Sequence, residues 1–160
     1  MISNNEMIAL LTNKAEDFYS EVNNGARIVS KGEYKKYEYI IVSYGTHPCA
    51  YVKVPDTNKF YTECDEDEVG EYIDAHGGIT FAGTLNKFDL TGFWIGWDYA
   101  HYGDYVGNNV HKSITKCMEG KKYSVENIQE ECIDVIKQLM CYEETRGLEQ
   151  NNVLGIEYKQ

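Results

Sequence analysis

The chain has 160 residues, of which 26 are acidic and 15 are basic, so its formal net charge at pH 7 is −11. Hydrophobic residues make up 42% of the chain and aromatic residues 13%, a composition typical of a folded globular protein that excludes a disordered one. The acidic balance excludes a general binder of the nucleic-acid backbone, because that affinity comes from Lys and Arg side chains that displace counterions, but it leaves open a mimic of nucleic acid.

The first segment, residues 1–25, is predicted to form an amphipathic helix. Ser3 and Glu6 stand at the spacing of a capping box, and apolar residues then recur at intervals of three and four as far as Val22. The run Asn23-Asn24-Gly25 ends this pattern. The segment has no basic leader and no cleavage motif, and no apolar run reaches the ~18–20 residues that span a bilayer. We therefore expect a cytoplasmic protein with no membrane partner.

Four short segments rich in β-branched and aromatic residues predict a mainly antiparallel central sheet: Tyr34–Ser43, Cys49–Val54, Ile79–Phe81 and Phe93–Tyr99. The first two flank the turn Gly45–Pro48, so they are expected to form a hairpin over Tyr34–Val54. The last two come after the break at Gly77-Gly78 and are expected to pair with each other. The order of the strands in the sheet does not follow from these patterns.

A second amphipathic helix is predicted over residues 124–145. Ser124 is expected to cap it, and its apolar face is formed by Val125, Ile128, Cys132, Val135 or Ile136, and Leu139. The chain is therefore predicted to be a single α+β domain over residues 1–160. Its sheet and candidate site are expected within residues 34–106, with two flanking amphipathic helices.

Two further features of the sequence, its acidic window and its cysteines, do not match the patterns of calcium or zinc sites, so we predict no metal site there. The acidic window from Glu63 to Asp74 is expected to be solvated, and it does not fit a calcium-binding loop that starts at Asp65, because its twelfth position is His76 and not Glu. The cysteines are scattered and include no C-x-x-C pair, which favours reduced thiols over a zinc site; they are Cys49, Cys64, Cys117, Cys132 and Cys141.

Potential chemistry is concentrated in one stretch between Asp74 and Asp104. The residues that we expect to bind a ligand are His76, Gly77, Gly78, Thr80, Trp94, Trp97, Asp98, His101 and Asp104. Imidazole and carboxylate groups can act as general acids and bases or as metal ligands, while glycines let backbone N–H groups approach an anion. Tryptophan rings can stack on a base. The glycines match neither a phosphate-binding loop nor a dinucleotide-binding fingerprint.

The same residues also have structural interpretations. His76 can hold the glycine turn through a bond to a nearby carbonyl group, and His101 can act in the same way. Trp94 and Trp97 lie on opposite sides of a regular strand, so at least one of them is expected in the core. The remaining histidines, His47 and His111, are interpreted as surface residues. Neither Ser nor Cys residues form a local signature of a catalytic triad.

Two motifs resemble a family of small phage and prophage proteins. They are Ala75-His76-Gly77-Gly78-Ile79-Thr80-Phe81-Ala82-Gly83 and Trp94-Ile95-Gly96-Trp97-Asp98-Tyr99-Ala100-His101-Tyr102-Gly103-Asp104-Tyr105. The resemblance covers roughly residues 37–140. Relatives commonly carry Cys where this chain has Tyr99, which disfavours thiol chemistry at that position. The resemblance implies the cytoplasm of a bacterial host as the setting, and it implies no particular reaction.

Three functions are compatible with this setting. The first, which we prefer, is a counter-defence protein that binds and sequesters a small nucleotide-derived immune signal, as a homo-oligomer and without a cofactor or resident metal. The second is a phosphodiesterase that degrades such a signal, with or without a divalent metal, through His76, Asp98, His101 and Asp104. The third is an acidic inhibitor that mimics nucleic acid and binds a host defence protein. None of the three requires direct binding of nucleic acid.

Overall fold

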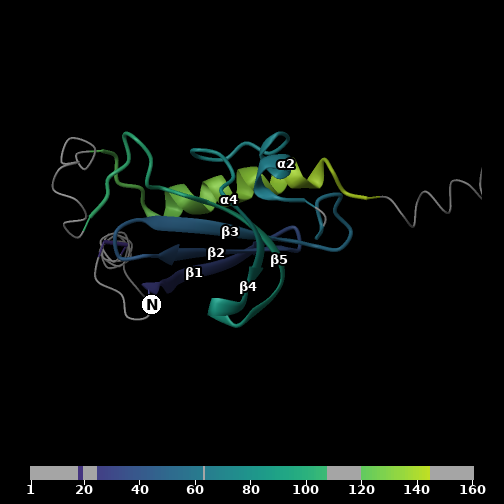
Figure 1. Cartoon of the computed structure of the whole chain (residues 1–160), viewed down its shortest axis with the longest axis horizontal. Coiled ribbons are helices and arrows are strands. Elements are labelled where there is room, and N and C mark those ends of the chain that lie inside the picture. Colours follow the sequence, from purple (N-terminus) through teal and green to yellow (C-terminus); the bar gives the residue numbers. More distant parts are fainter. Residues whose placement is uncertain (1–17, 20–24, 63, 108–119, 145–160) are drawn as a thin grey trace, which may run out of the picture.

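The computed structural model describes residues 18–19, 25–62, 64–107 and 120–144, which form a mixed α+β fold, as the sequence predicts (Figure 1). In chain order the elements are β1 (Arg27–Tyr34), β2 (Tyr37–Ser43), β3 (Pro48–Val54), α2 (Glu66–Gly70), β4 (Phe81–Leu85), the short 3₁₀ helix η2 (Asn86–Phe88), β5 (Leu90–Asp98) and α4 (Val125–Met140). The helix expected over residues 1–25 lies outside the described residues, apart from residues 18, 19 and 25. Among the described residues, no helix is long and apolar enough to cross a membrane.

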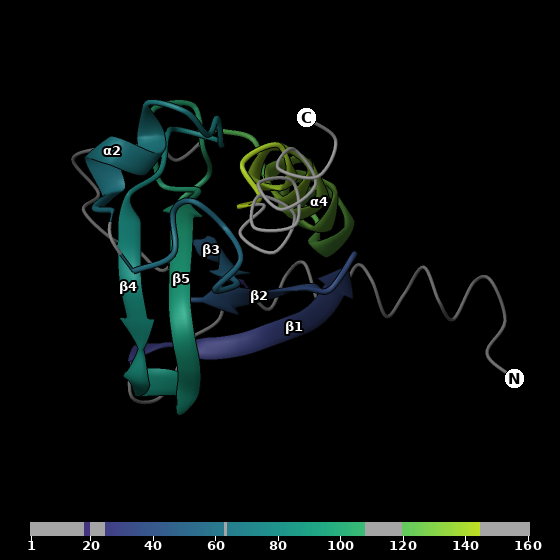
Figure 2. The same ribbon diagram turned by 90° about the vertical axis from the view of Figure 1, so that its right-hand side faces the viewer.

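The described strands form one five-stranded antiparallel sheet in the order β1-β2-β3-β5-β4. The expected hairpin is confirmed, since β2 and β3 pair from Tyr39 with Val52 to Ser43 with Pro48. Strand β5 lies between β3 and β4, so its C-terminal end is next to the starts of both neighbours. Figure 2 shows β4 and β5 crossing the direction of β1 at a steep angle, which makes the sheet strongly twisted.

The strand boundaries differ from those that the sequence predicts. Strand β1 was not expected, and Tyr34 ends it instead of starting β2, because Lys35 and Lys36 form a two-residue turn with φ angles of 50° and 71°. The strand expected at Ile79–Phe81 is β4, which begins only at Phe81, because the chain first buries Ile79 after its glycine turn.

The helix expected over residues 124–145 is present as α4 but ends at Met140. Its start is as predicted, since the Ser124 side chain accepts a hydrogen bond from the Asn127 N–H group at 3.0 Å. Its end is earlier because the following segment turns back to the β3–α2 connection, where the Lys59 N–H group donates to the Tyr142 carbonyl at 2.9 Å. Residue 145 itself lies outside the described residues.

Two hydrophobic clusters lie on the two faces of the sheet. The larger cluster is covered by α4, and Val52, Ile95 and Trp97 point into it from the strands. The α4 side chains in it are Val125, Ile128, Cys132, Val135, Ile136 and Leu139, so the predicted apolar face is confirmed and both of the alternatives Val135 and Ile136 belong to it. The smaller cluster on the other face includes Trp94 and Tyr51. The two tryptophans therefore lie on opposite faces, as their spacing in the strand predicts.

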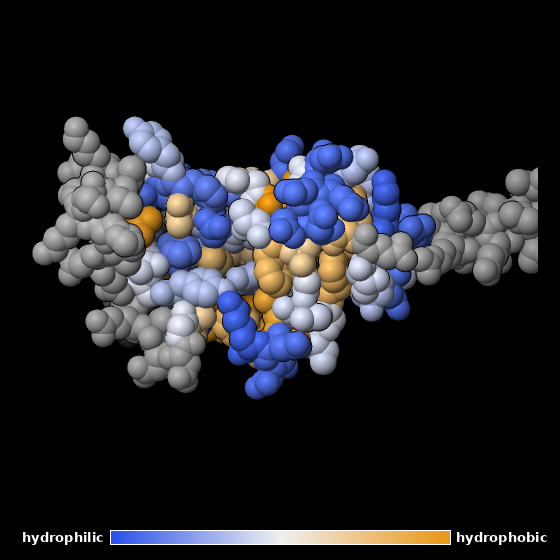
Figure 3. All heavy atoms as spheres, viewed as in Figure 1, coloured by the Kyte–Doolittle hydropathy of each residue, from blue (hydrophilic) through white to orange (hydrophobic). Residues whose placement is uncertain are grey.

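In the acidic window, the described acidic side chains from Asp65 to Asp74 are exposed, as expected. Helix α2 begins after Asp65, whose side chain accepts a hydrogen bond from the Glu68 N–H group at 2.9 Å, and its three acidic side chains are exposed. In Figure 3 the surface over α2 is correspondingly hydrophilic. The described cysteines form no disulfide with one another; they are Cys49, Cys64, Cys132 and Cys141.

Replacement of one buried residue on α4 tests whether this helix supports the sheet. Ile128 is fully buried, so Ile128→Ala should lower the free energy of unfolding by about 2–5 kcal/mol, because it removes apolar contacts and leaves a cavity. The matched control is Glu130→Ala, since Glu130 is exposed on the same helix and its replacement should change stability by less than about 0.5 kcal/mol. Urea unfolding followed by circular dichroism measures both. Equal stability of the two variants would contradict the packing of α4.

Candidate functional site

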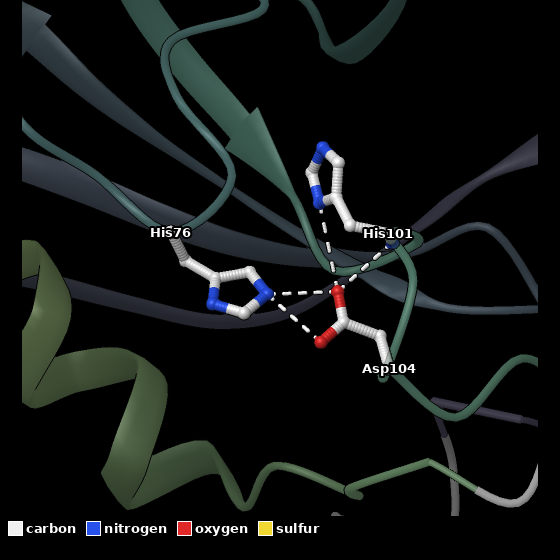
Figure 4. Close-up of side chains that lie close together, drawn as sticks. All are labelled: His76, His101 and Asp104. Atoms are coloured by element: carbon white, nitrogen blue, oxygen red, sulfur yellow. Dashed lines mark hydrogen bonds and ion pairs between the residues drawn. The ribbon is translucent and has the colours of Figure 1, made fainter. Parts of the chain in front are cut away.

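Three of the predicted site residues come together at one end of β5: His76, His101 and Asp104. His76 comes from the loop before β4, while His101 and Asp104 come from the loop after β5 (Figure 4). The Nε2 atom of His76 lies 2.9 Å and 2.7 Å from the two carboxylate oxygens of Asp104. One nitrogen of each histidine and one Asp104 oxygen all lie within 4.8 Å of one another. The two loops are far apart in the sequence, and the antiparallel pairing of β4 with β5 places them side by side.

The loop after β5 is a turn closed by its own aspartate. The Asp104 N–H group donates to the His101 carbonyl at 2.8 Å, and the His101 N–H group donates to Asp104 Oδ2 at 2.9 Å. An aspartate that accepts a bond from a neighbouring backbone N–H group is a common way to stabilise a turn. Asp104 is only 3% exposed, so these bonds also compensate its loss of hydration.

His76 is held in place by aromatic rings and by α4. Its imidazole is stacked on the Tyr99 ring, with centroids 4.6 Å apart and planes 11° apart, and meets the edge of the Tyr123 ring at 5.1 Å. Its backbone N–H group donates to Glu131 Oε1 on α4 at 2.7 Å. The orientation of this histidine therefore depends on contacts with residues far away in the sequence.

The first glycine of the His-Gly-Gly turn makes room for the second histidine. Gly77 has a φ angle of +70°, and a Cβ atom on it would lie 2.1 Å from Cε1 of the His101 ring. Gly78 also has a positive φ angle, +90°, but a Cβ atom there would meet nothing within 4 Å. Position 77 therefore requires glycine for two reasons. The positive φ angle disfavours other residues, and a side chain at this position would collide with the His101 ring.

His101 lies between two carboxylates without a hydrogen bond from its side chain to either. Its Nδ1 atom is 3.5 Å from Asp98 Oδ1 and 3.5 Å from Asp104 Oδ2. This nitrogen is buried and has no hydrogen-bond partner in the described structure. Asp98 is itself held by other groups, since Oδ2 accepts from the Thr80 hydroxyl at 3.3 Å and Oδ1 accepts from the Ala100 N–H group at 3.1 Å.

A cavity of about 430 Å³ lies beside this cluster, and its wall includes Asp98, which lies 3.5 Å from His101 Nδ1. Its wall combines aromatic, charged and hydroxyl-bearing side chains: Tyr44, His47, Cys49, Tyr51, Thr80, Phe81, Lys87, Trp97 and Asp98. The Lys87 ammonium lies 4.6 Å from the centre of the Tyr44 ring and donates to the hydroxyl of the same tyrosine. That hydroxyl lies 2.7 Å from the hydroxyl of Tyr51. The wall therefore offers aromatic surface, one cation and one carboxylate.

The structure adds His47, which the sequence predicted to be a surface histidine. His47 is half-buried and lines the cavity, stacked on the Tyr44 ring with centroids 5.7 Å apart and planes 20° apart. Its Nδ1 atom lies 2.7 Å from the Thr46 hydroxyl. The surface interpretation was wrong because β3, which starts at the next residue, pairs with the end of β5. Only the strand order, which places Cys49 opposite Asp98, reveals this position.

The charge states of two cavity residues follow from their burial. Burial lowers the pKa of His47 below its ordinary value, and the charge of His101 acts in the same direction, while Asp98 and Asp104 oppose them. Burial and the nearby Asp98 charge raise the pKa of the Cys49 thiol, which is therefore protonated at neutral pH. Cys49 is thus unsuited to act as a nucleophile.

The two tryptophans are buried and contribute less to the cavity than the sequence suggests. Trp97 is 1% exposed and forms part of the wall, and its Nε1–H group donates to the Tyr99 hydroxyl at 3.1 Å. Trp94 is 2% exposed in the smaller core cluster, where its Nε1–H group donates to the Thr91 carbonyl at 3.0 Å. The flat surfaces available for stacking come instead from Tyr44, His47 and other rings of the wall.

No family model matches this chain, and neither do the curated proteins or the solved structures with which it was compared. A function therefore has to be inferred from the chemistry and geometry of the site itself. Two features of the site are available for this inference. They are the His76–His101–Asp104 cluster and the aromatic cavity, which meet at Asp98.

The two glycines of the turn provide a matched test of the packing of His101. Gly77→Ala and Gly78→Ala both place a side chain at a positive φ angle, which costs about 1–2 kcal/mol. Only Gly77→Ala also pushes against the His101 ring, so it should destabilise the protein more and shift the imidazole resonances of His101. Thermal unfolding and NMR of the histidine side chains measure these effects. Equal effects of the two replacements would contradict the contact.

The lowered pKa of His47 predicts a loss of stability in acid. The folded protein resists protonation of His47, so neutral His47 contributes to the free energy of unfolding. This contribution is complete above the ordinary pKa of 6.5 and is lost as the pH falls through the lower pKa of His47 in the folded state. His47→Gln should therefore show a smaller loss of stability on acidification than the wild-type protein. The measurement is the urea midpoint between about pH 7.5 and pH 5. Identical pH profiles of the two proteins would refute this role of His47.

Proposed function

We propose that this protein binds and sequesters a small nucleotide-derived signal in the aromatic cavity beside its histidine cluster. The observation that carries the proposal is the composition of the wall of the 430 Å³ cavity, which combines several rings with Lys87, Thr80 and Asp98. Ligand pockets typically combine aromatic surface with a few polar groups in this way, in volumes of about 300–1,000 Å³. The resemblance to phage proteins supports an immune signal of the bacterial host as the ligand.

Each group of the wall has a counterpart in a nucleotide. The parallel rings of Tyr44 and His47 offer a surface on which a base can stack. The Lys87 ammonium is exposed at the same tyrosine and can bind a phosphate group. The Asp98 carboxylate and the Thr80 hydroxyl can accept and donate hydrogen bonds to a ribose or to the edge of a base.

Binding without turnover is favoured by the nature of the groups in the wall. The thiol there, Cys49, is held protonated by burial and is 5% exposed. The Thr80 hydroxyl donates to the Asp98 carboxylate at 3.3 Å, and a carboxylate is a much weaker base than an alkoxide, so it activates a hydroxyl nucleophile poorly. A protein that holds its ligand and does not convert it fits these groups best.

Hydrolysis of a phosphodiester is the second candidate, and it is favoured by the cluster itself. His76 with Asp104 forms a paired acid and base, and His101 lies between that pair and Asp98 in the cavity wall. In this function His101 would exchange a proton with a bound ligand, because its Nδ1 atom lies 3.5 Å from Asp98 in the cavity wall. The two candidates therefore share one cavity but differ in whether the ligand is recovered intact.

Calorimetric titration of cyclic nucleotides, dinucleotides and ADP-ribose derivatives tests ligand binding. For any compound that binds, Lys87→Ala should weaken the affinity roughly tenfold, since loss of one charge-assisted bond to phosphate costs about 1.4 kcal/mol. Lys53→Ala is the matched control, because Lys53 pairs with Glu38 and lies outside the cavity wall, and it should leave the affinity unchanged.

The bound compound is then recovered by heating the complex and is weighed by mass spectrometry. Intact recovery after prolonged incubation supports sequestration, whereas recovery of a cleaved product that disappears in His101→Ala supports hydrolysis. No heat from any compound in the panel would refute binding of this ligand class. Inhibition of a host nuclease that is lost when Glu66, Asp67 and Glu68 are neutralised would instead support the acidic mimic.

A further inference from the structure

We propose that His76, His101 and Asp104 bind a first-row divalent transition metal ion, with Zn²⁺ as the closest chemical match. This inference goes beyond ligand binding in the cavity and does not depend on it. The three donor atoms are one nitrogen of each imidazole and one oxygen of the carboxylate, all within 4.8 Å of one another. Donors bound to one zinc ion at about 2.0–2.2 Å lie roughly 3.3 Å apart, so small side-chain movements suffice to complete the site.

The strongest indication is the unpartnered nitrogen of His101. Its Nδ1 atom is buried and lacks a hydrogen-bond partner among the residues that the structure describes, although it lies 3.5 Å from Asp104 Oδ2. A buried polar atom without a partner costs free energy, and native structures usually provide one. A metal ion between this nitrogen and the Asp104 carboxylate would satisfy the lone pair of the imidazole and the charge of the carboxylate at once.

The second indication is that the three ligands are already oriented by groups around them. Tyr99 stacks on the His76 ring, and Gly77 leaves the space in which the His101 ring lies. The Asp104 carboxylate is fixed by the His101 N–H group at 2.9 Å. Metal sites are typically supported by such interactions around their ligands, which hold the imidazole rings in the orientation required for coordination.

The donor set also discriminates between metals. Two imidazole nitrogens and one carboxylate oxygen suit zinc, manganese, iron, cobalt and nickel, whereas calcium and magnesium prefer oxygen donors alone. Three protein ligands leave at least one coordination position open in a tetrahedral ion. Asp98 lies 3.5 Å from the His101 nitrogen and lines the cavity, so the ion would lie next to the cavity wall.

Sequence patterns name these three residues as candidates but do not bring them together as a metal site. The sequence predicted no metal, because the cysteines lack zinc-binding spacing and the acidic window lacks a calcium loop. The three ligands are separated by 28 residues from His76 to Asp104, and they meet only through the pairing of β4 with β5. The three ligands therefore come together only in the tertiary structure, where the loop before β4 lies next to the loop after β5.

The test is titration of the chelator-treated full chain with Zn²⁺ by calorimetry and with Co²⁺ by absorption spectroscopy. We expect one ion per chain and a cobalt spectrum of nitrogen and oxygen ligation. Replacement of a residue that only supports a metal ligand typically weakens metal affinity roughly 10–100-fold. Removal of a ligand itself should weaken it further, so we expect a larger loss in each of the variants His76→Ala, His101→Ala and Asp104→Asn. Asp67→Asn is the control, because Asp67 is an exposed carboxylate of α2, and it should bind as the wild type does.

Circular dichroism of each variant separates loss of ligands from loss of the fold. The wild-type protein provides a test that needs no variant, since Zn²⁺ should shift the imidazole nitrogen resonances of His76 and His101 in NMR spectra. Absence of stoichiometric binding to the wild-type chain would refute the site, because a purely structural His76–Asp104 pair takes up no metal. Intense sulfur-to-cobalt charge-transfer bands would also refute it, since they would assign the ion to cysteines.

Discussion

The buried carboxylate of Asp104 is the constraint on which the functional end of this protein depends. It is 3% exposed, and a charge removed from water in this way destabilises a fold by several kcal/mol unless other groups compensate it. Compensation comes from His76 in one loop and from the His101 N–H group in the other. A single side chain thus holds together two loops that the sheet brings close to each other.

The same cluster connects the two faces of the sheet. On one side His76 stacks on Tyr99 and is fixed by Glu131 of α4, which covers the larger core. On the other side Asp98 and His47 belong to the wall of the cavity. His101 lies between these two environments, with Nδ1 at 3.5 Å from both Asp98 and Asp104. Events in the cavity and events in the cluster are therefore expected to influence each other through this ring.

The net charge of the chain limits how an anionic ligand can bind. With a formal charge of −11, the protein as a whole repels anions, so long-range attraction cannot raise the association rate. Affinity has to come from short-range contacts inside the cavity, where Lys87, the stacked rings and the hydroxyl groups are concentrated. A bound divalent ion next to Asp98 would add positive charge at the same place, which would favour phosphate-bearing ligands.

Local sequence patterns by themselves determined the α+β class, the β2–β3 hairpin, the capped start and buried face of α4, and the candidate His and Asp residues. These features depend on side-chain periodicity and turn chemistry over a few neighbouring residues. The tertiary structure alone decided the strand order, the presence of β1, the place of His47 in the cavity and the meeting of His76 with Asp104. Such contacts join residues far apart in the chain, as His76 and Glu131 are at a separation of 55 residues. They are set by register and packing, which no local pattern encodes.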